Sequence, residues 1–157
     1  MNIKIVKFDK KQAKDVTSLI RSTYLKFNAE DAQKSFTNFY LDYHDFAKDL
    51  QQFIKRMEKK EINLVALDKN QVIGVIMGTK SRMASFFVQK KYQSQGIGSQ
   101  LLSRYETKAK RLGSGIIKLN ASSFAVSFYQ KNGYIKTTGI RNIKGKGILA
   151  QPMKKVF

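Results

Sequence analysis

The chain has 157 residues, no cysteine, one histidine and a formal net charge of +19. This length suffices for a sizeable core, and we expect residues 1–157 to form a single domain. The composition excludes disulfides, a thiolate zinc site and a multi-histidine metal site, and there is no run of about 18 apolar residues that would predict a membrane span.

The first third of the chain predicts one strand followed by two helical regions. Residues 2–8 alternate as a strand does, and they do not resemble a secretory leader, so we expect a cytoplasmic protein without a membrane span. Asp9 and Gln12 resemble a capping box before a helix that reaches about Phe27. A second helical region begins near residue 30 and carries aromatic residues on its inner face as far as Met57. Residues 42–45 are expected to kink or divide it.

The remainder predicts six strands and two further helices. Residues 62–67 and 71–78 form a hairpin around a turn at 68–70, and residues 84–88 form a third strand. A helix follows over residues 97–112, then a strand at 116–120 and a helix that Ser122 and Ser123 can cap. The last strands are expected at 134–138 and 148–153. The order β-α-α-β-β-β-α-β-α-β-β predicts an α/β fold with one mixed sheet flanked by helices.

The charge is unevenly distributed along the chain. After Asp68 the only acidic residue is Glu106, whereas residues 107–157 contain eleven lysines and arginines. This half of the chain suits an anionic ligand. The positive charge also permits a nucleic-acid-binding module as an alternative function. Because no aromatic RNA-binding signature, zinc motif or clear recognition helix is present, nucleic acid is not the expected partner.

The most informative stretch joins the strand ending at Val88 to the helix beginning near Ile97. Its segment Gln93-Ser94-Gln95-Gly96-Ile97-Gly98-Ser99 opens directly into the helix. Free amides and the helix dipole make such a junction suitable for an anion, most often a phosphate. A P-loop is excluded because Ser99 and Gln100, not lysine and serine, follow Gly98. A dinucleotide fold is excluded because its third glycine and its acidic residue are missing.

At this point the sequence resembles the GCN5-related N-acetyltransferase (GNAT) family. Residues 93–98 are similar to its Gln/Arg-x-x-Gly-x-Gly/Ala signature for acetyl-CoA. Residues 122–134, Ser-Ser-Phe-Ala-Val-Ser-Phe-Tyr-Gln-Lys-Asn-Gly-Tyr, are similar to its Asn/Ser-x-x-Ala-x-x-Phe-Tyr-x-x-x-Gly-Phe stretch. Either motif alone is weak, since a Gly-x-Gly also serves tight turns, but the two lie at the separation typical of the family. The element order agrees over nearly the whole chain.

The resemblance implies a GNAT-like acyl-CoA N-acyltransferase fold with acetyl-CoA as co-substrate and no metal. The turn amides would bind the coenzyme pyrophosphate. The main chain of the strand before the turn would pair with the pantetheine arm and polarise the thioester carbonyl. The coenzyme-binding residues implied in this way are Phe86, Phe87, Val88, Gln93, Ser94, Gln95, Gly96, Ile97, Gly98, Ser99, Ser122 and Lys131.

Tyr129 matches the general acid of the family, a phenol that protonates the departing thiolate. Residue type and spacing alone favour a core tyrosine on a helix over a catalytic one, and the family resemblance reverses this preference. Lys90 and Lys91 are further candidates for the coenzyme phosphates, although such lysines are often simply solvated.

The acceptor side departs from the family pattern. Many members carry a carboxylate base on the central strand, whereas this chain has Ala84, Ser85 and Phe86 there. Any carboxylate base must therefore come mainly from the first third of the chain, or else water and backbone carbonyls serve. Residues considered for this role are Glu30, Asp31, Asp42, Asp45 and His44; Tyr24, Glu30 and Asp31 are assigned to the acceptor groove.

The predicted activity is acetyl-CoA-dependent N-acetylation by direct transfer to a primary amine in a ternary complex. The acceptor is expected to be a small molecule or a peptide or protein, and the enzyme a monomer or homodimer. The alternatives are the basic nucleic-acid-binding module and a non-catalytic coenzyme-binding sensor with the same fold.

Overall fold

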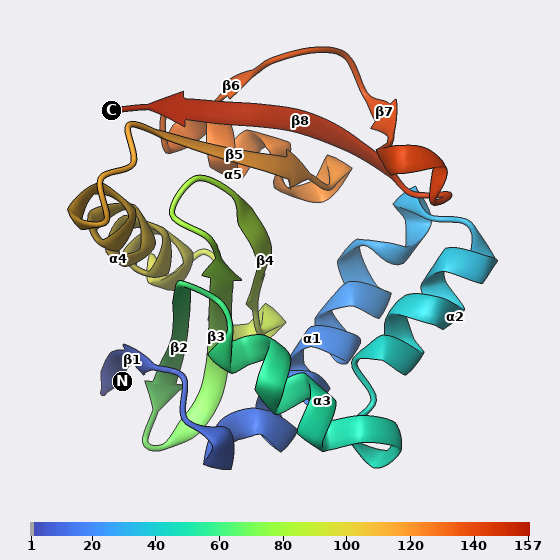
Figure 1. Cartoon of the computed structure of the whole chain (residues 1–157), viewed down its shortest axis with the longest axis vertical. Coiled ribbons are helices and arrows are strands. Elements are labelled where there is room, and N and C mark those ends of the chain that lie inside the picture. Colours follow the sequence, from blue (N-terminus) through green and yellow to red (C-terminus); the bar gives the residue numbers. More distant parts are fainter. Residues whose placement is uncertain (1) are drawn as a thin grey trace.

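The computed structural model describes residues 2–157, which form a mixed α/β fold (Figure 1). The α-helices are α1 (Ala13–Phe27), α2 (Lys34–Tyr43), α3 (Phe46–Glu58), α4 (Ile97–Arg111) and α5 (Val126–Lys131). The strands are β1 (Ile3–Lys7), β2 (Ile62–Asp68), β3 (Gln71–Gly78), β4 (Met83–Val88), β5 (Ile116–Ala121), β6 (Ile135–Lys136), β7 (Arg141–Asn142) and β8 (Leu149–Val156). Short 3₁₀ turns include η2 (Ala29–Asp31), η3 (Lys90–Tyr92) and η4 (Ser123–Ala125).

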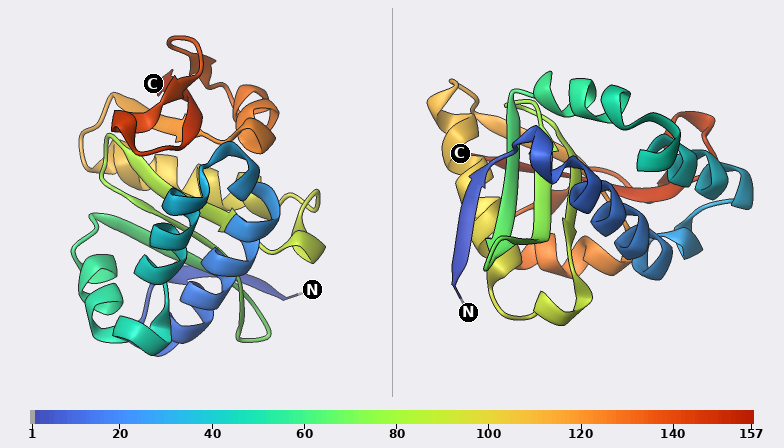
Figure 2. Two further views of the ribbon diagram at one scale, coloured as in Figure 1. Left: turned by 90° about the vertical axis from the view of Figure 1, so that its right-hand side faces the viewer. Right: turned by 90° about the horizontal axis from the view of Figure 1, so that it is seen from below.

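The first sheet contains β1, β2, β3 and β4 in sequence order, with all neighbours antiparallel. Its central strands are almost continuously apolar because both faces are covered by helices. Helix α4 packs on one face, whereas α1 and α3 contribute to a separate core cluster on the other (Figure 2). The first sheet therefore separates two hydrophobic core clusters.

The second sheet is centred on β8. Strands β5 and β6 pair with β8 antiparallel, and β7 pairs with its first residues. In Figure 1 this sheet lies across the top of the first. Its inward side chains, including Leu119 and Met153, join the core beneath α4.

The two sheets meet at one point and then separate. A parallel bridge joins Arg82 to Lys118, and the Lys118 amide donates to the carbonyl of Ser81 at 2.9 Å. Beyond this bridge β4 pairs only with β3. The predicted α/β class is thus confirmed, and the expected single sheet is divided between β4 and β5.

Most predicted elements lie where expected, with local differences. The capping box of Asp9 and Gln12 forms both of its hydrogen bonds, and the region after residue 30 divides into α2 and α3. The strand predicted at 134–138 is only two residues long. Leu112, the last residue of the helix predicted at 97–112, is 46% exposed because the helix ends at Arg111. No helix among residues 2–157 has the length and apolarity needed to cross a membrane.

Candidate active site

A turn of two left-handed residues presents the N-terminus of α4 to solvent. Ser94 has φ 59° and Gly96, the N-cap residue, has φ 79°. The Gln100 amide bonds to the carbonyl of Gly96, and no acceptor among residues 2–157 is found for the amides of residues 96–99. The first turn of α4 contains no acidic side chain that would compete for these donors. Free amides at a helix N-terminus, reinforced by the helix dipole, are suited to binding an anion.

Side chains hold this turn in shape. The Gln93 amide group donates to the carbonyl of Val88 at 2.9 Å, and that of Gln95 donates to the carbonyl of Lys91 at 2.7 Å. The Tyr92 hydroxyl anchors the adjoining η3 to Asp68 at 3.1 Å. Because local contacts fix the backbone, the free amides stay oriented without a ligand.

The edge of β4 facing β5 offers main-chain hydrogen-bonding groups. The Gln89 amide donates to the carbonyl of Ile73, and this bond shows which residues of β4 direct their main-chain groups to β3 and which direct them away from it. Antiparallel pairing alternates, so Phe87 bonds towards β3, whereas Phe86 directs its N–H and C=O groups, and Val88 its N–H group, into the gap. The Val88 carbonyl on this edge accepts from the Gln93 side chain. An extended ligand in the gap can therefore pair with β4 as an additional strand does.

This gap forms a cleft of about 550 Å³ between β4, the α4 turn and the β5–α5 connection. Its walls are mostly aromatic and small polar side chains, and its one charged side chain is Lys131. The lining residues are Thr23, Phe27, Asn28, Phe86, Phe87, Val88, Gln93, Ser94, Gly96, Gly98, Ser99, Ser122, Phe124, Ala125, Ser127, Phe128, Tyr129 and Lys131. A methyl group at Gly98 would lie 3.3 Å from the Phe128 ring, so α4 and α5 approach closely here.

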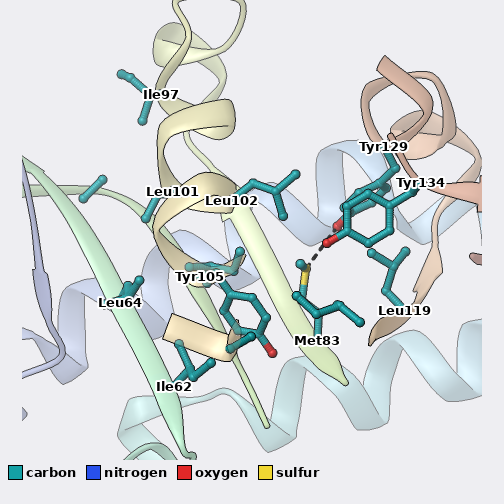
Figure 3. Packing of buried hydrophobic residues seen from close by; sticks show 14 of the residues in the cluster. Ile62, Leu64, Met83, Ile97, Leu101, Leu102, Tyr105, Leu119, Tyr129 and Tyr134 are labelled. Atoms are coloured by element: carbon teal, nitrogen blue, oxygen red, sulfur yellow. Dashed lines mark hydrogen bonds between the residues drawn. The ribbon is translucent and has the colours of Figure 1, made fainter. Parts of the chain in front are cut away.

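Tyr129 lies where the cleft meets the core. Its hydroxyl donates to the sulfur of Met83 at 3.6 Å, with the Tyr134 ring beside it (Figure 3). The rings of Phe86 and Phe128 also contact the Tyr129 ring. Burial raises the pKa of the Tyr129 phenol, so the group keeps its proton at neutral pH. A protonated phenol beside a coenzyme-sized cleft is suited to donating a proton.

A strap from the end of α1 crosses to the β5–α5 connection. The ring of Phe27 stacks on Phe124 with centroids 4.4 Å apart, and the Asp31 carboxylate accepts from the Ser123 amide at 2.9 Å and hydroxyl at 3.0 Å. The Gln33 amide then bonds to the carbonyl of Gly147 at 2.7 Å. These contacts close one end of the cleft.

The structure brings most of the predicted coenzyme-binding residues into this one cleft. Phe86, Phe87, Val88, Gln93, Ser94, Gly96, Gly98, Ser99, Ser122, Tyr129 and Lys131 all line it. The side chains of Gln95 and Ile97 do not line it, although the Ile97 amide belongs to the free set. Ser122 makes no capping bond through its side chain. The roles of these residues remain predictions.

The predicted acceptor residues lie elsewhere. Tyr24 is 2% exposed and stacks on Tyr40 at 4.2 Å, its hydroxyl 3.2 Å from that of Thr37. Asp31 is held by Ser123, and Glu30 is exposed on η2. None of the three lines the cleft. No cluster of three or more histidine, aspartate or glutamate side chains suited to a metal ion is found in residues 2–157.

Several cleft residues were not singled out in the sequence. Phe27 was named only as the approximate end of a helix, and Phe124 and Phe128 were part of the second motif without a role. The available signal for Phe124 and Phe128 was their place within that motif. The contact that unites Phe27 with Phe124 spans most of the chain and has no local signature.

Comparison with known proteins is consistent with this geometry. The model of the family described as "Acetyltransferase (GNAT) domain" matches residues 26–157. A structure named GCN5-related N-acetyltransferase: Aminotransferase, Class-II, from Rhodopseudomonas palustris aligns with TM-score 0.83 and 18% identity over 100% of this chain and 97% of that one. No match was found among curated protein sequences.

Two further solved structures share the fold. The PaiA N-acetyltransferase from Thermoplasma acidophilum, in complex with coenzyme A, aligns with TM-score 0.78 and 19% identity over 100% of both chains. A GNAT-family acetyltransferase from Streptococcus pneumoniae aligns with TM-score 0.75 and 19% identity over 99% of both.

Proposed function

The chain belongs to the GNAT acetyltransferase family, and from that premise we propose that it transfers the acetyl group of acetyl-CoA directly to a primary amine. Both substrates would be bound at once, without a covalent enzyme intermediate. The acceptor would be a small molecule or the amine of a peptide or protein.

One observation carries this proposal: free helix amides and a free strand edge open into the same cleft. The amides of residues 96–99 suit the pyrophosphate of the coenzyme. The N–H and C=O groups of Phe86 and the N–H group of Val88 suit the amide-containing pantetheine arm. Lys131 supplies a positive charge to this anionic ligand.

The reaction balances with the groups present. The neutral amine nitrogen attacks the thioester carbon, a C–N bond forms, and the C–S bond breaks. Negative charge that develops on the carbonyl oxygen would be stabilised by a β4 amide directed into the gap, from Phe86 or Val88. Tyr129 would protonate the departing thiolate, the amine would lose one proton to solvent, and Tyr129 would regain its proton from solvent.

Calorimetry with acetyl-CoA at moderate salt tests the binding step. We expect one site per chain, and a screen of amines and peptides that monitors free thiol then tests transfer. Absence of acetyl-CoA binding would refute the proposal. Binding without acetylation of any amine would favour the sensor alternative.

The role of Tyr129 is tested by Tyr129→Phe. This change leaves the ring packing intact and is expected to lower kcat about 100-fold without weakening acetyl-CoA binding. Tyr134→Phe is the matched control, because Tyr134 is a buried neighbour that does not line the cleft. Unchanged kcat in Tyr129→Phe, in an otherwise active enzyme, would remove Tyr129 as the acid.

A further inference from the structure

The cleft contains no side chain that could take a proton from an ammonium group near neutral pH. Within the described residues 2–157, its lining includes no aspartate, glutamate or histidine. On β4, where a base would face the thioester, the side chains are Ala84, Ser85 and Phe86. The amine must therefore arrive neutral or lose its proton to water.

The carboxylates of the first third of the chain are engaged or distant. Asp31 accepts two hydrogen bonds from Ser123, Asp42 pairs with Lys48 at 2.7 Å, and Asp45 pairs with Arg21 at 3.0 Å while capping α3. Of the acids considered as bases, only Glu30 is without such a partner among residues 2–157, and its side chain is exposed outside the cleft.

The single imidazole is also unsuited to the task. His44 ends α2, is 5% exposed, and directs Nδ1 to the carbonyl of Tyr40 at 2.9 Å. Its ring lies among Tyr40, Tyr43 and Phe53 and does not reach the cleft. It belongs to the packing between α2 and α3.

Positive charge beside the cleft opposes a cationic acceptor. Lys131 lines the cleft, Lys26 directly precedes the lining residue Phe27, and Lys90 lies two residues after the lining residue Val88. Lys26 and Lys90 are close enough that the Lys90 ammonium lowers the pKa of Lys26. An ammonium approaching this surface is repelled, whereas a neutral amine is not.

We propose that the acceptor is a weakly basic primary amine, such as the α-amino group of an amino acid or peptide, and not an alkylamine such as a lysine side chain or a polyamine. This inference rests on the proposed acetyl transfer. An α-amino group of pKa about 7.8 is about 30% neutral at pH 7.4, whereas a lysine amine of pKa about 10.4 is about 0.1% neutral. The neutral, reactive fraction at pH 7.4 is therefore about 300-fold larger for the α-amine than for the lysine amine. A site without a base cannot remove this difference.

A single probe that carries both amines tests the proposal. Lysine amide and the peptide Ala-Lys-Ala each contain one α-amine and one ε-amine, so mass spectrometry of the monoacetylated product gives the ratio directly. We expect α-acetylation to exceed ε-acetylation at least tenfold at pH 7.4. Predominant ε-acetylation would overturn the proposal.

The pH profile gives an independent readout. With saturating acetyl-CoA, kcat/KM should rise with pH and level off at the pKa of the acceptor used, near 8 for alanine amide and near 10 for an N-α-acetylated lysine amide. A levelling point between pH 5 and 7 shared by both acceptors would show an enzyme base and refute the inference.

Glu30→Gln tests the nearest exposed carboxylate, with the exposed Glu58→Gln as its control. The pH at which the profile levels off should still follow the pKa of the acceptor in both variants. A profile altered by Glu30→Gln alone would identify Glu30 as a base and contradict the proposal.

Acetyl-CoA binding with preferential ε-acetylation would remove this inference only. Loss of acetyl-CoA binding, or no acetylation of any amine, would remove the proposed transfer and this inference with it.

Discussion

His44 makes the stability of this protein sensitive to acid. Burial lowers its pKa from 6.5 to about 4, and the nearby Arg56 and Arg21 act in the same direction. The hydrogen bond to the carbonyl of Tyr40 opposes this shift only in part. Lowering the pH from 7.5 to 4.5 should therefore weaken the packing between α2 and α3.

The size of the effect follows from proton linkage. Between pH 6.5 and 4 the unfolded chain protonates His44 while the folded chain does not, so the free energy of unfolding falls as the pH falls. A pKa difference of about 2.5 units corresponds to a maximum loss of about 3 kcal/mol. This is a large share of the roughly 5–15 kcal/mol typical of a folded domain. Below pH 4 both states bind the proton, and His44 adds no further loss.

Urea unfolding at pH 7.5, 6.5, 5.5 and 4.5 measures the effect, with His44→Phe as the reference. Phenylalanine fits among Tyr40, Tyr43 and Phe53, and the carbonyl of Tyr40 keeps its bond from the main-chain amide of residue 44. The free energy of unfolding of the natural chain, minus that of His44→Phe, should fall by roughly 2–3 kcal/mol from pH 7.5 to pH 4.5. A difference that stays constant with pH would refute the reasoning.

Three further predictions concern packing, the coenzyme and the strap. Gly78→Ala should lower the free energy of unfolding by about 3 kcal/mol in urea titration, because its methyl group would overlap a carbonyl and a hydroxyl beneath the β3–β4 bulge. Gly98→Ala should raise the acetyl-CoA Kd about tenfold in calorimetry, because the methyl group projects beside the helix amides. Asp31→Ala should cost about 1 kcal/mol in urea titration by removing both bonds to Ser123.

Matched variants separate these effects from general damage. Gly115→Ala and Gly139→Ala place a methyl group in open space outside the cleft and should leave stability and the acetyl-CoA Kd nearly unchanged. Ser123→Ala should cost less than Asp31→Ala, because the Ser123 amide keeps its bond to the carboxylate. If Gly78→Ala is as stable as Gly115→Ala, the predicted overlap at residue 78 is wrong. An unaltered acetyl-CoA Kd in Gly98→Ala would contradict the role given to residue 98. A larger loss of unfolding free energy in Ser123→Ala than in Asp31→Ala would contradict the role given to the Asp31 carboxylate.

Local patterns were sufficient to predict much of this fold. The capping pair Asp9 and Gln12, the apolar runs of β2 and β3, and the glycine turn before α4 each express a rule that acts within a few residues. The turn was also located correctly because it follows a strand and precedes a helix in the sequence itself.

Contacts between distant segments could not be predicted in this way. Asp31 was assigned to the acceptor groove, yet its carboxylate holds Ser123, 92 residues away. The inward position of Tyr24 depends on Tyr40 in another helix. The separation of the two sheets depends on where β5 meets β4, which strand propensity does not determine. Each of these requires the tertiary arrangement.

The central position of β8 has a consequence for biosynthesis. The four strands of the first sheet all lie within residues 3–88, so the ribosome has delivered that sheet in full while Leu149–Val156 is still to be translated. Until then β5 has no partner on its β8 side, and its open edge is a place for unwanted pairing. The β5–α5 side of the cleft, whose lining residues end at Lys131, therefore gains the strand that pairs with β5 only when β8 has been translated.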